Sequence, residues 1–390
     1  MQSFAKPLTD QEGVALVITL LILALLIAAG VGVTLSVQAD LKTSSNLKTA
    51  TQAFYIAEAG LERAKAEISG HKSFDSVLAG MDVDKESLQD NGILSFGAGA
   101  SFAGGRYEVR VTDNRDDNDI WDDSDRKVTI TATGKFGGST RVIKVLVTKA
   151  NLSFNAPLNV VDDRCELLFG ESAVVDGHDK TSNPQDWNSP DPGPGPDVHG
   201  LARDCTTFNE DAFVPANKIN DIQGLGGIRD LTSDLGSLTL AELQTIRGEM
   251  VSVPDMAYDG DTNVSTNLAL GSRESPNVTH VKGTLTVSGT VTGAGILIVD
   301  NELRVTGNFA FEGLILIGLC GTCPGRMEIS STGSARIYGA VVLANATSAY
   351  DEQAGIETLA GRGAIYYSTK GIDLALRRTF KTLFWQEVFD

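Results

Sequence analysis

Residues 11–37 read QEGVALVITLLILALLIAAGVGVTLSV, and residues 46–68 read NLKTATQAFYIAEAGLERAKAEI. From Val14 to Val37 the chain holds no charged residue. At about 1.5 Å per residue this apolar run forms roughly 36 Å of helix, which is enough to cross a hydrocarbon core. No proline interrupts either stretch. The two stretches therefore predict one helix of about 55 residues, with its first half in a membrane and its second half in water.

The second half of this predicted helix carries apolar residues in strict steps of three and four. They are Leu47, Ala50, Phe54, Ala57, Leu61, Ala64 and Ile68. Such spacing places them in one narrow stripe, while charged residues such as Glu58 stay in water. We expect the stripe to pack on a sheet formed by the following part of the chain.

Two simpler interpretations of the apolar run remain open. A secretory signal peptide has an apolar core of about 7–15 residues, which this run exceeds, although Val37-Gln38-Ala39 has the pattern of a cleavage site. A single-span anchor accounts for the hydrophobicity but not for the amphipathic continuation.

The composition is acidic, with 32 Lys and Arg against 50 Asp and Glu and a formal net charge of −18. Such a charge repels nucleic acid, so we expect no partner of that class. Four cysteines in a chain whose bulk lies outside the cytoplasm suggest disulfides. The natural pairing joins Cys165 with Cys205 and Cys320 with Cys323, and other pairings stay open.

The N-terminal residues also carry a family resemblance. A short leader ending in Gly13, the run VALVITLLILALL (residues 14–26) and the block AFYIAEAGLERA (residues 53–64) resemble the N-terminus of PilX-type minor pilins. K-type minor pseudopilins of type II secretion systems are similar. The resemblance implies that prepilin peptidase cuts after Gly13 and that Val14 becomes the methylated N-terminus. Most pilins carry Glu at the fifth mature position, where this chain has Ile18.

The same resemblance implies a subunit that is stored in the inner membrane and then built into an extracellular pilus. Its helix would contact the major pilin and other minor pilins. We expect these contacts at Ile18, Leu47, Phe54, Ala57, Glu58 and Leu61. In pilins the missing acid pairs with the amine of the subunit added before, so Ile18 favours a tip position, where a large tip adhesin is a further partner. A pseudopilus of a type II secretion system is the alternative.

Three strand patterns follow the helix, at residues 106–112, 127–136 and 140–149. Apolar and polar residues alternate in the first two, and Gly137-Gly138 predicts a tight hairpin between the second and third. A long helix followed by an antiparallel meander matches a pilin head.

An acidic loop, DNRDDNDIWDDSD (residues 113–125), joins the first two of these strands. Calcium binds six to eight oxygens, and loops rich in Asp supply them. The expected ligands are Asp113, Asp117, Asp119, Asp123 and Asp125. The loop lacks the Gly and Glu of an EF-hand, and a solvated acidic loop without a metal is the open alternative.

The C-terminal half predicts a repeating β structure. From residue 283 three units share an aliphatic run, an alternating strand and a glycine corner, at a step of about 18 residues, with residues 319–326 inserted in the third. This pattern predicts a β-solenoid and resembles β-helical domains found after PilX-type N-termini. Thr239 and Glu242 form a capping box for a short helix over residues 236–248.

The fold class we expect is α+β: a long transmembrane and amphipathic helix, an antiparallel pilin-like sheet, and a β-solenoid. The expected parts are a leader (residues 1–13), the helix (14–70, with 14–37 in the membrane), a β head (71–150), a loop-rich disulfide-bonded connector (151–235) and the solenoid with a C-terminal cap (236–390).

Two questions stay open for the solenoid. β-helices also host enzymes that cleave polysaccharides, but the outward polar residues, among them Asp300, Glu302 and Glu312, form no recognisable catalytic pair. We therefore expect no enzyme, with a β-helical carbohydrate-binding protein or adhesin as an alternative. The aromatic tail, residues 371–390, either caps the last coil or forms an exposed docking patch.

Overall fold

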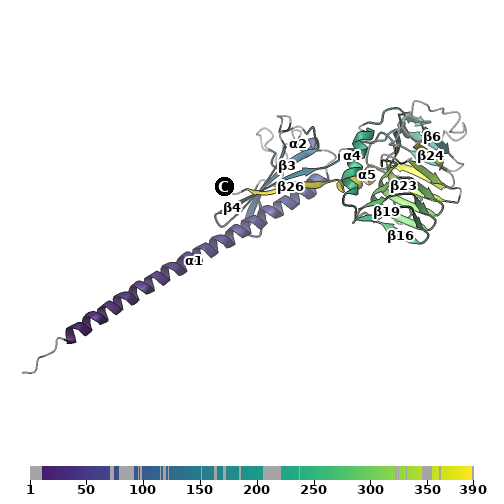
Figure 1. Ribbon diagram of the computed structural model, residues 1–390. Coiled ribbons are helices and arrows are strands. Elements are labelled where there is room, and N and C mark those ends of the chain that lie inside the picture. The colour runs from purple at the N-terminus through teal and green to yellow at the C-terminus, as the bar shows by residue number, and fades with distance from the viewer. Residues whose placement is uncertain are drawn as a thin grey trace, which may run out of the picture.

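The computed structural model describes most of the chain. The described residues are 11–70, 74–78, 92–94, 96, 99–114, 116, 120–121, 123–150, 152–161, 165–169, 173–183, 186–204, 221–236, 238–320, 323, 325–330, 332–344, 354–359 and 362–388. A long helix leads into a small β head, and a larger β domain follows at the far end (Figure 1). We call this larger part, residues 152–378, the parallel β domain.

The predicted N-terminal helix is confirmed as one uninterrupted element, α1 (Gln11–Ser69), of 59 residues. It ends where Gly70 begins a turn. Its apolar N-terminal half projects away from the rest of the protein, whereas its C-terminal half lies along the head (Figure 1). The continuous apolar run thus lies in the free part of the helix, and the packed part lies within the heptad stripe, with Ala53 as its first buried residue.

The head is a five-stranded antiparallel sheet laid against α1. Its strands, in the order β1-β2-β3-β4-β26, are β1 (Ala100–Phe102), β2 (Gly105–Asp113), β3 (Lys127–Phe136), β4 (Ser139–Thr148) and β26 (Lys381–Val388). A short helix, α2 (Asp75–Leu78), adds Val77 and Leu78 to the head core. Alternation buries Val109 and Ile130 in the head core with the α1 residues, as the sequence predicts for these two strands, and it buries Val145 of β4 in the same way. Gly137 and Gly138 both have positive φ and make the expected two-residue hairpin.

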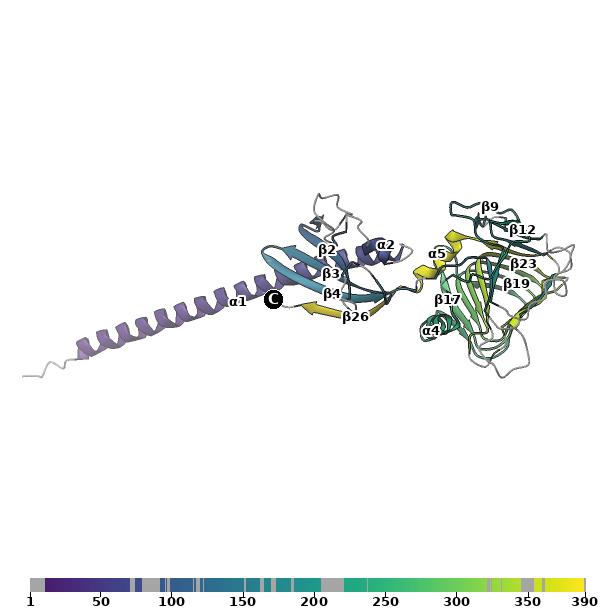
Figure 2. The same cartoon turned by 90° about the horizontal axis from the view of Figure 1, so that it is seen from above.

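The last strand of this sheet corrects one expectation. We expected the tail to cap the last coil of a solenoid, yet β26 pairs antiparallel with β4, with Trp385 opposite Val145. Figure 2 shows β26 running back along β4 after α5 (Thr369–Arg377). The whole parallel β domain is therefore inserted between two neighbouring strands of the head. A pairing between strands so far apart in the chain leaves no local pattern, so the sequence does not reveal it.

The parallel β domain is built from two large sheets and a two-stranded ribbon. The 13-stranded sheet contains β5 (Leu158–Val161), β7 (Val174–Asp176), β10 (Leu201–Arg203), β11 (Ile222–Gly224), β12 (Gly227–Ile228), β13 (Leu231–Thr232), β14 (Met256–Tyr258), β16 (Asn267–Leu270), β17 (Asn277–Val281), β19 (Thr290–Val299), β21 (Asn308–Ile317), β23 (Ser334–Ala344) and β25 (Arg362–Tyr367). The six-stranded sheet contains β15 (Thr262–Val264), β18 (Leu285–Val287), β20 (Glu302–Val305), β22 (Arg326–Ile329), β24 (Ala354–Leu359) and β6 (Cys165–Phe169), and the ribbon joins β8 (Lys180–Thr181) to β9 (Asp191–Pro192).

The strand register confirms the predicted repeat step. Leu285 pairs with Leu303 in the six-stranded sheet, and Leu297 pairs with Ile315 in the larger one, so both sheets advance by the interval that the sequence predicts. The next copy is longer, since Leu303 pairs with Met327. The extra residues lie in the region of the insertion predicted at residues 319–326, although Arg326 itself belongs to the repeat, since it pairs with Glu302 in the six-stranded sheet.

The connector that we expected at residues 151–235 is more regular than its sequence suggests. β5 pairs in parallel with β23, β7 with β25, and β6 with β24, so this stretch adds strands to both sheets. These strands are only three to five residues long and their partners lie far along the chain, so no repeat is visible. The described residues of the proline-rich stretch, 183 and 186–200, lie mostly at the surface and include strand β9.

Two helices cover one outer face of the larger sheet. α4 (Leu240–Val251) buries Leu243, Ile246 and Met250, and α5 buries Ile372 and Leu376. They pack on a layer of strand residues that includes Ile296, Leu314 and Val342. This cover explains the unbroken apolar runs of β19, β21 and β23, which are buried on both faces. Thr239 caps α4 by accepting a hydrogen bond from the backbone of Glu242, which is the predicted Thr239 half of the capping box, while the Glu242 carboxylate pairs with Arg126 and the helix begins later than the predicted residue 236.

Candidate functional site

The N-terminal half of α1 exposes a continuous apolar surface. Leu16 is 67 % exposed and Ile18 52 %, and the large aliphatic residues as far as Leu41 are similarly uncovered. This part of the helix is long and apolar enough to cross a membrane, and none of that window is buried within the protein. Gly13 and Val14 lie in the first turn of α1. A surface of this kind needs lipid or other helices around it.

The C-terminal half of α1 is held by its own head. Ala57, Leu61, Ala64 and Ile68 are fully buried against the sheet, and Phe54 is half-buried. The stripe therefore packs as predicted from Phe54 onward. Leu47, by contrast, is 67 % exposed, so the prediction that it packs on the sheet is wrong. The contact between helix and sheet ends near Thr49. The hydroxyl oxygens of Thr49 and Ser139 lie 2.9 Å apart, beside the Gly137-Gly138 hairpin.

This burial divides the residues that we expected to contact other subunits. Ala57 and Leu61 are covered by the protein's own sheet and are not accessible to a neighbour in this arrangement. Ile18, Leu47 and Glu58 lie on exposed parts of the helix.

Helix and sheet approach most closely at two glycines. A Cβ atom on Gly134 of β3 would lie 2.1 Å from the backbone oxygen of Ala53 and 2.5 Å from the backbone nitrogen of Ala57. A Cβ atom on Gly60 would lie 2.8 Å from the ring of Tyr107. The small residues of the AEAGL block therefore bring the helix backbone down onto the sheet.

The polar residues beside this contact secure the same geometry. Arg63 donates a hydrogen bond to the Tyr107 hydroxyl at 3.0 Å and lies over the Phe96 ring, 4.4 Å from its centroid. At the end of the helix, Lys149 Nζ donates to the Ser69 carbonyl at 2.9 Å. Burial lowers the pKa of Lys149 to about 8, against an opposing effect of Asp373.

The acidic loop brings three of its five predicted calcium ligands together. Carboxylate oxygens of Asp113, Asp123 and Asp125 all lie within 4.8 Å of one another, and Asp113 is buried. Asp117 and Asp119 lie outside the described residues. The cluster has partial charge compensation, because Lys127 Nζ lies 2.5 Å from Asp125.

One of the two expected disulfides is present. Cys320 and Cys323 are bonded, with their Cα atoms 5.6 Å apart, and they close the insertion in the third repeat. Cys165 begins strand β6, whereas Cys205 lies outside the described residues, so the structure does not address their pairing.

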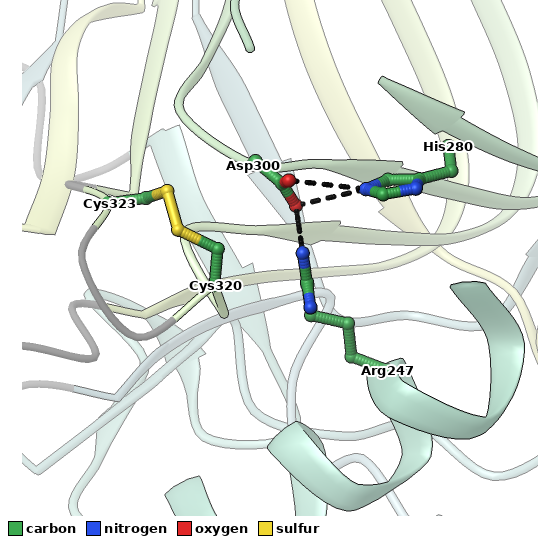
Figure 3. Close-up of a disulfide and its surroundings, with 5 residues drawn as sticks. All are labelled: Arg247, His280, Asp300, Cys320 and Cys323. Carbon is green, nitrogen blue, oxygen red and sulfur yellow. Dashed lines mark hydrogen bonds and ion pairs between the residues drawn. A yellow bond between two sulfur atoms is a disulfide. The ribbon is translucent and has the colours of Figure 1, made fainter. Parts of the chain in front are cut away.

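Beside this disulfide lies a buried charged group that the sequence did not reveal (Figure 3). Asp300 accepts hydrogen bonds from Arg247 of α4, at 2.6 Å, and from His280, at 3.2 Å. Burial raises the pKa of Asp300, but the hydrogen bonds from His280 and Arg247 outweigh it and hold that pKa below its usual range. We expected Asp300 to point outward; instead it ties α4 to the sheet.

Glu312 was likewise expected to point outward and is fully buried. It forms an ion pair with Arg273, and the Ser182 hydroxyl donates to it at 3.0 Å. Its register partner on β23 is Tyr338, which stacks on Tyr366. Ser182 and Trp187, from another part of the chain, lie beside this position, and the sequence of β21 alone does not reveal them.

Comparison with known families assigns the long helix. Residues 12–62 match the family model described as PilX N-terminal. The chain carries a PilX N-terminal segment.

Other comparisons add little to this assignment. No curated protein matches the chain. Among solved structures, the crystal structure of competence-associated pilin ComZ from Thermus thermophilus aligns with a TM-score of 0.24 and 15 % identity, over 87 % of this chain and 97 % of that chain.

The PilX segment spans both the exposed and the head-bound parts of α1. Its heptad predicted the buried positions from Ala57 onward, but it omitted Ala53 and Ile56, which are also buried. Both flank the heptad on the helix surface, and their burial shows that the face covered by the sheet is wider than one narrow stripe. The breadth of this contact comes from the close approach at Gly134.

Proposed function

We propose that this protein is a minor pilin of a type IV pilus. Prepilin peptidase removes residues 1–13 by cutting after Gly13, and residues 14–37 hold the subunit in the inner membrane until it enters the filament. The observation that carries this proposal is the division of α1. One rigid PilX-type helix has an apolar half without cover and a second half locked into a β head.

This division suits a subunit whose apolar half of α1 is surrounded by lipid before assembly and by other subunits in the filament. The free half of α1 can leave the bilayer without unfolding, because all its backbone hydrogen bonds are internal to the helix. The head stays in place because Ala57, Leu61 and Ala64 bind it along several turns. In the filament, Ile18, Leu47 and Glu58 contact the major pilin and other minor pilins.

We propose that the subunit occupies the tip of the filament and primes its assembly. Ile18 stands where most pilins carry Glu, so this helix has no carboxylate to pair with the amine of a subunit added before it. The parallel β domain extends well beyond the head, and such bulk is easier to place at an end, where a large tip adhesin would bind, than repeatedly along a shaft (Figure 1).

Immunogold labelling of sheared filaments tests the position. We expect label at filament ends, and label distributed along shafts would contradict it. The variant Ile18→Glu provides a matched comparison, because restoring the acid should let some subunits enter the shaft. Recovery of the protein with type II secretion components and not with pili would assign it to a pseudopilus instead.

We further propose that the parallel β domain winds as a β-solenoid and has no catalytic activity. The equal repeat step in both sheets supports the first part. For the second, the buried carboxylates Asp300 and Glu312 are both held in ion pairs. Release of reducing ends from a panel of polysaccharides by the purified protein would contradict it.

We also propose that the acidic loop binds calcium. Three carboxylates converge, and oxygen ligands suit this ion, although Lys127 must move away from Asp125. Calcium titration should release heat and raise the melting temperature in the wild type but not in Asp123→Asn. An identical response in both proteins, or none in either, would contradict the site.

A further inference from the structure

A small pocket opens on the parallel β domain, next to the buried carboxylate of Glu312. It has a volume of about 310 Å³ and is lined by residues of the 271–274 turn, strand β19, strand β21 and the surface segment that carries Trp187. Small-molecule sites start at about 300 Å³, so the pocket suits a ligand of one or two rings.

Glu312 lines this pocket and has one carboxylate oxygen that is not used in a hydrogen bond. Glu312 Oε2 binds Arg273 and Ser182, but within the described part of the chain Glu312 Oε1 has no hydrogen-bond partner although it is buried. A buried carboxylate oxygen without a partner costs free energy, which a ligand donating a hydrogen bond would recover.

An aromatic side chain also lines the pocket and is held in place. Trp187 lines the pocket, and its ring packs on Tyr338 with 5.9 Å between centroids. The Tyr338 hydroxyl donates to the Trp187 backbone oxygen at 2.6 Å, which fixes the segment over the sheet. Tyr338 stacks in turn on Tyr366. The indole is therefore a preformed platform for a flat, weakly polar face.

The remaining lining groups complete a mixed set of donors and acceptors. Ser272 and Thr292 add hydroxyls, Arg273 adds a guanidinium, and Glu274 adds a second carboxylate. Arg273 is already paired with Glu312, so the charges at the pocket sum to −1 and disfavour an anion.

We propose that this pocket binds an uncharged sugar residue. A pyranose ring presents an apolar face of C–H groups, which suits the Trp187 indole, and hydroxyls at its edge, which suit the unused acceptor Glu312 Oε1. Sugar binding needs only the parallel β domain, so it goes beyond the proposed role in a filament and does not depend on it. A protein exposed outside the cell would use such a site to contact surface glycans.

Ligand-observed NMR on the full-length chain tests this directly. The protein is held in a polyoxyethylene detergent, because detergents with sugar head groups would compete. The probes are methyl glycosides of glucose, galactose, mannose and N-acetylglucosamine, with glucuronate and choline as charged comparators. We expect at least one neutral glycoside to bind with a Kd on the order of 1 mM, as befits a single small ring.

Two variants and one control locate the binding. Trp187→Ala should weaken it about tenfold or more, as loss of a central aromatic contact does. Glu312→Gln should also weaken it, because the amide must turn its oxygen toward Arg273 and its NH₂ toward the ligand. Trp385→Ala, which removes an exposed tryptophan in the head, should leave affinity unchanged.

Each contrary outcome overturns the proposal. The proposal is wrong if no neutral glycoside binds, or if glucuronate or choline binds more tightly than the neutral glycosides. It is also wrong if the wild type and both pocket variants bind with equal affinity. Melting temperature and far-UV circular dichroism of each variant exclude loss of binding through misfolding. If Trp187→Ala is unfolded, the Glu312→Gln result decides.

Discussion

Replacing Gly134 by Ala tests how tightly the PilX helix is bound to its head. The new Cβ atom would lie 2.1 Å from the Ala53 oxygen and 2.5 Å from the Ala57 nitrogen. Both are backbone atoms in the middle of a long helix, so neither can rotate away. Ordinary van der Waals contact begins at 3.4 Å. α1 must therefore move away from β3 by most of the difference between 3.4 Å and these two shorter distances.

The size of the effect follows from this displacement. A gap of about 1 Å forfeits a quarter to a half of the dispersion energy of the atoms facing it. Overpacking of a well-filled core typically costs about 1–3 kcal/mol, and the rigid neighbours here place the cost near the upper end. Ala in place of Gly in a strand returns about 0.5–1 kcal/mol through the unfolded chain. We therefore expect a net loss of about 2 kcal/mol.

Hydrogen exchange measured by mass spectrometry on the full-length protein reports this loss where it occurs. Peptides covering residues 53–68 and strand β3 should exchange faster in Gly134→Ala, while peptides of the parallel β domain should not change. Gly248→Ala in α4 is the matched control, since its new Cβ atom meets nothing within 4 Å. That variant should be stabilised by about 0.5–1 kcal/mol. Unchanged exchange of the head in Gly134→Ala would refute the close approach of helix and sheet.

Three further predictions concern the head, the repeat insertion and the tail. The pKa of Lys149 is lowered from 10.5 to about 8 in the folded state, so between these pH values the unfolded chain binds more protons than the folded one. The free energy of unfolding, measured by urea denaturation, should therefore rise from about pH 8 to about pH 10. Lys149→Met should lose this rise, and an identical pH profile in both proteins would contradict the assignment. Replacing Cys320 and Cys323 by Ser removes a cross-link across three residues and should cost about 2 kcal/mol on the chain-entropy model, seen as a lower melting temperature. A truncation after Phe380 removes β26 and should speed hydrogen exchange in β4, whereas removal of residues 389–390 alone should not; equal protection of β4 in both would exclude the pairing of these strands.

The long helix and the repeat step were predictable because both depend on residues that are close together in the sequence. An uncharged run, a heptad and a short repeat each lie within a narrow window of sequence. The disulfide between Cys320 and Cys323 belongs to the same class, because its partners are three residues apart. The Thr239 cap is local as well.

The features that escaped prediction depend on contacts between distant residues. β26 pairs with β4 across the whole inserted domain, and β5 pairs with β23 from the opposite end of it. Glu312 occupies a strand position that alternation assigns to solvent, but Ser182, Trp187 and Arg273, from distant parts of the chain, lie beside it. Asp300 is buried for the same kind of reason, by Arg247 of α4. Side-chain polarity alone does not tell whether another segment covers a residue.

The insertion of the parallel β domain within the head has a mechanical consequence. Residue 150 leaves the head from β4, and residue 381 returns to it at the neighbouring strand, so two chain segments join the domains. The two domains are also joined by an ion pair, in which the Arg126 guanidinium of the head lies 3.4 Å from the Glu242 carboxylate of α4. A load applied to the far domain therefore reaches α1 through two covalent connections and not through one flexible linker.

The mature N-terminus of the protein taken from sheared filaments tests the central claim most directly. Mass spectrometry of its N-terminal peptide should show a chain that begins at Val14 and carries a methyl group on its amine. The protein should be present in the filament fraction of a strain with prepilin peptidase and absent from that fraction without it. A chain that keeps residues 1–13, or begins after Ala39 as a secreted protein would, contradicts the account.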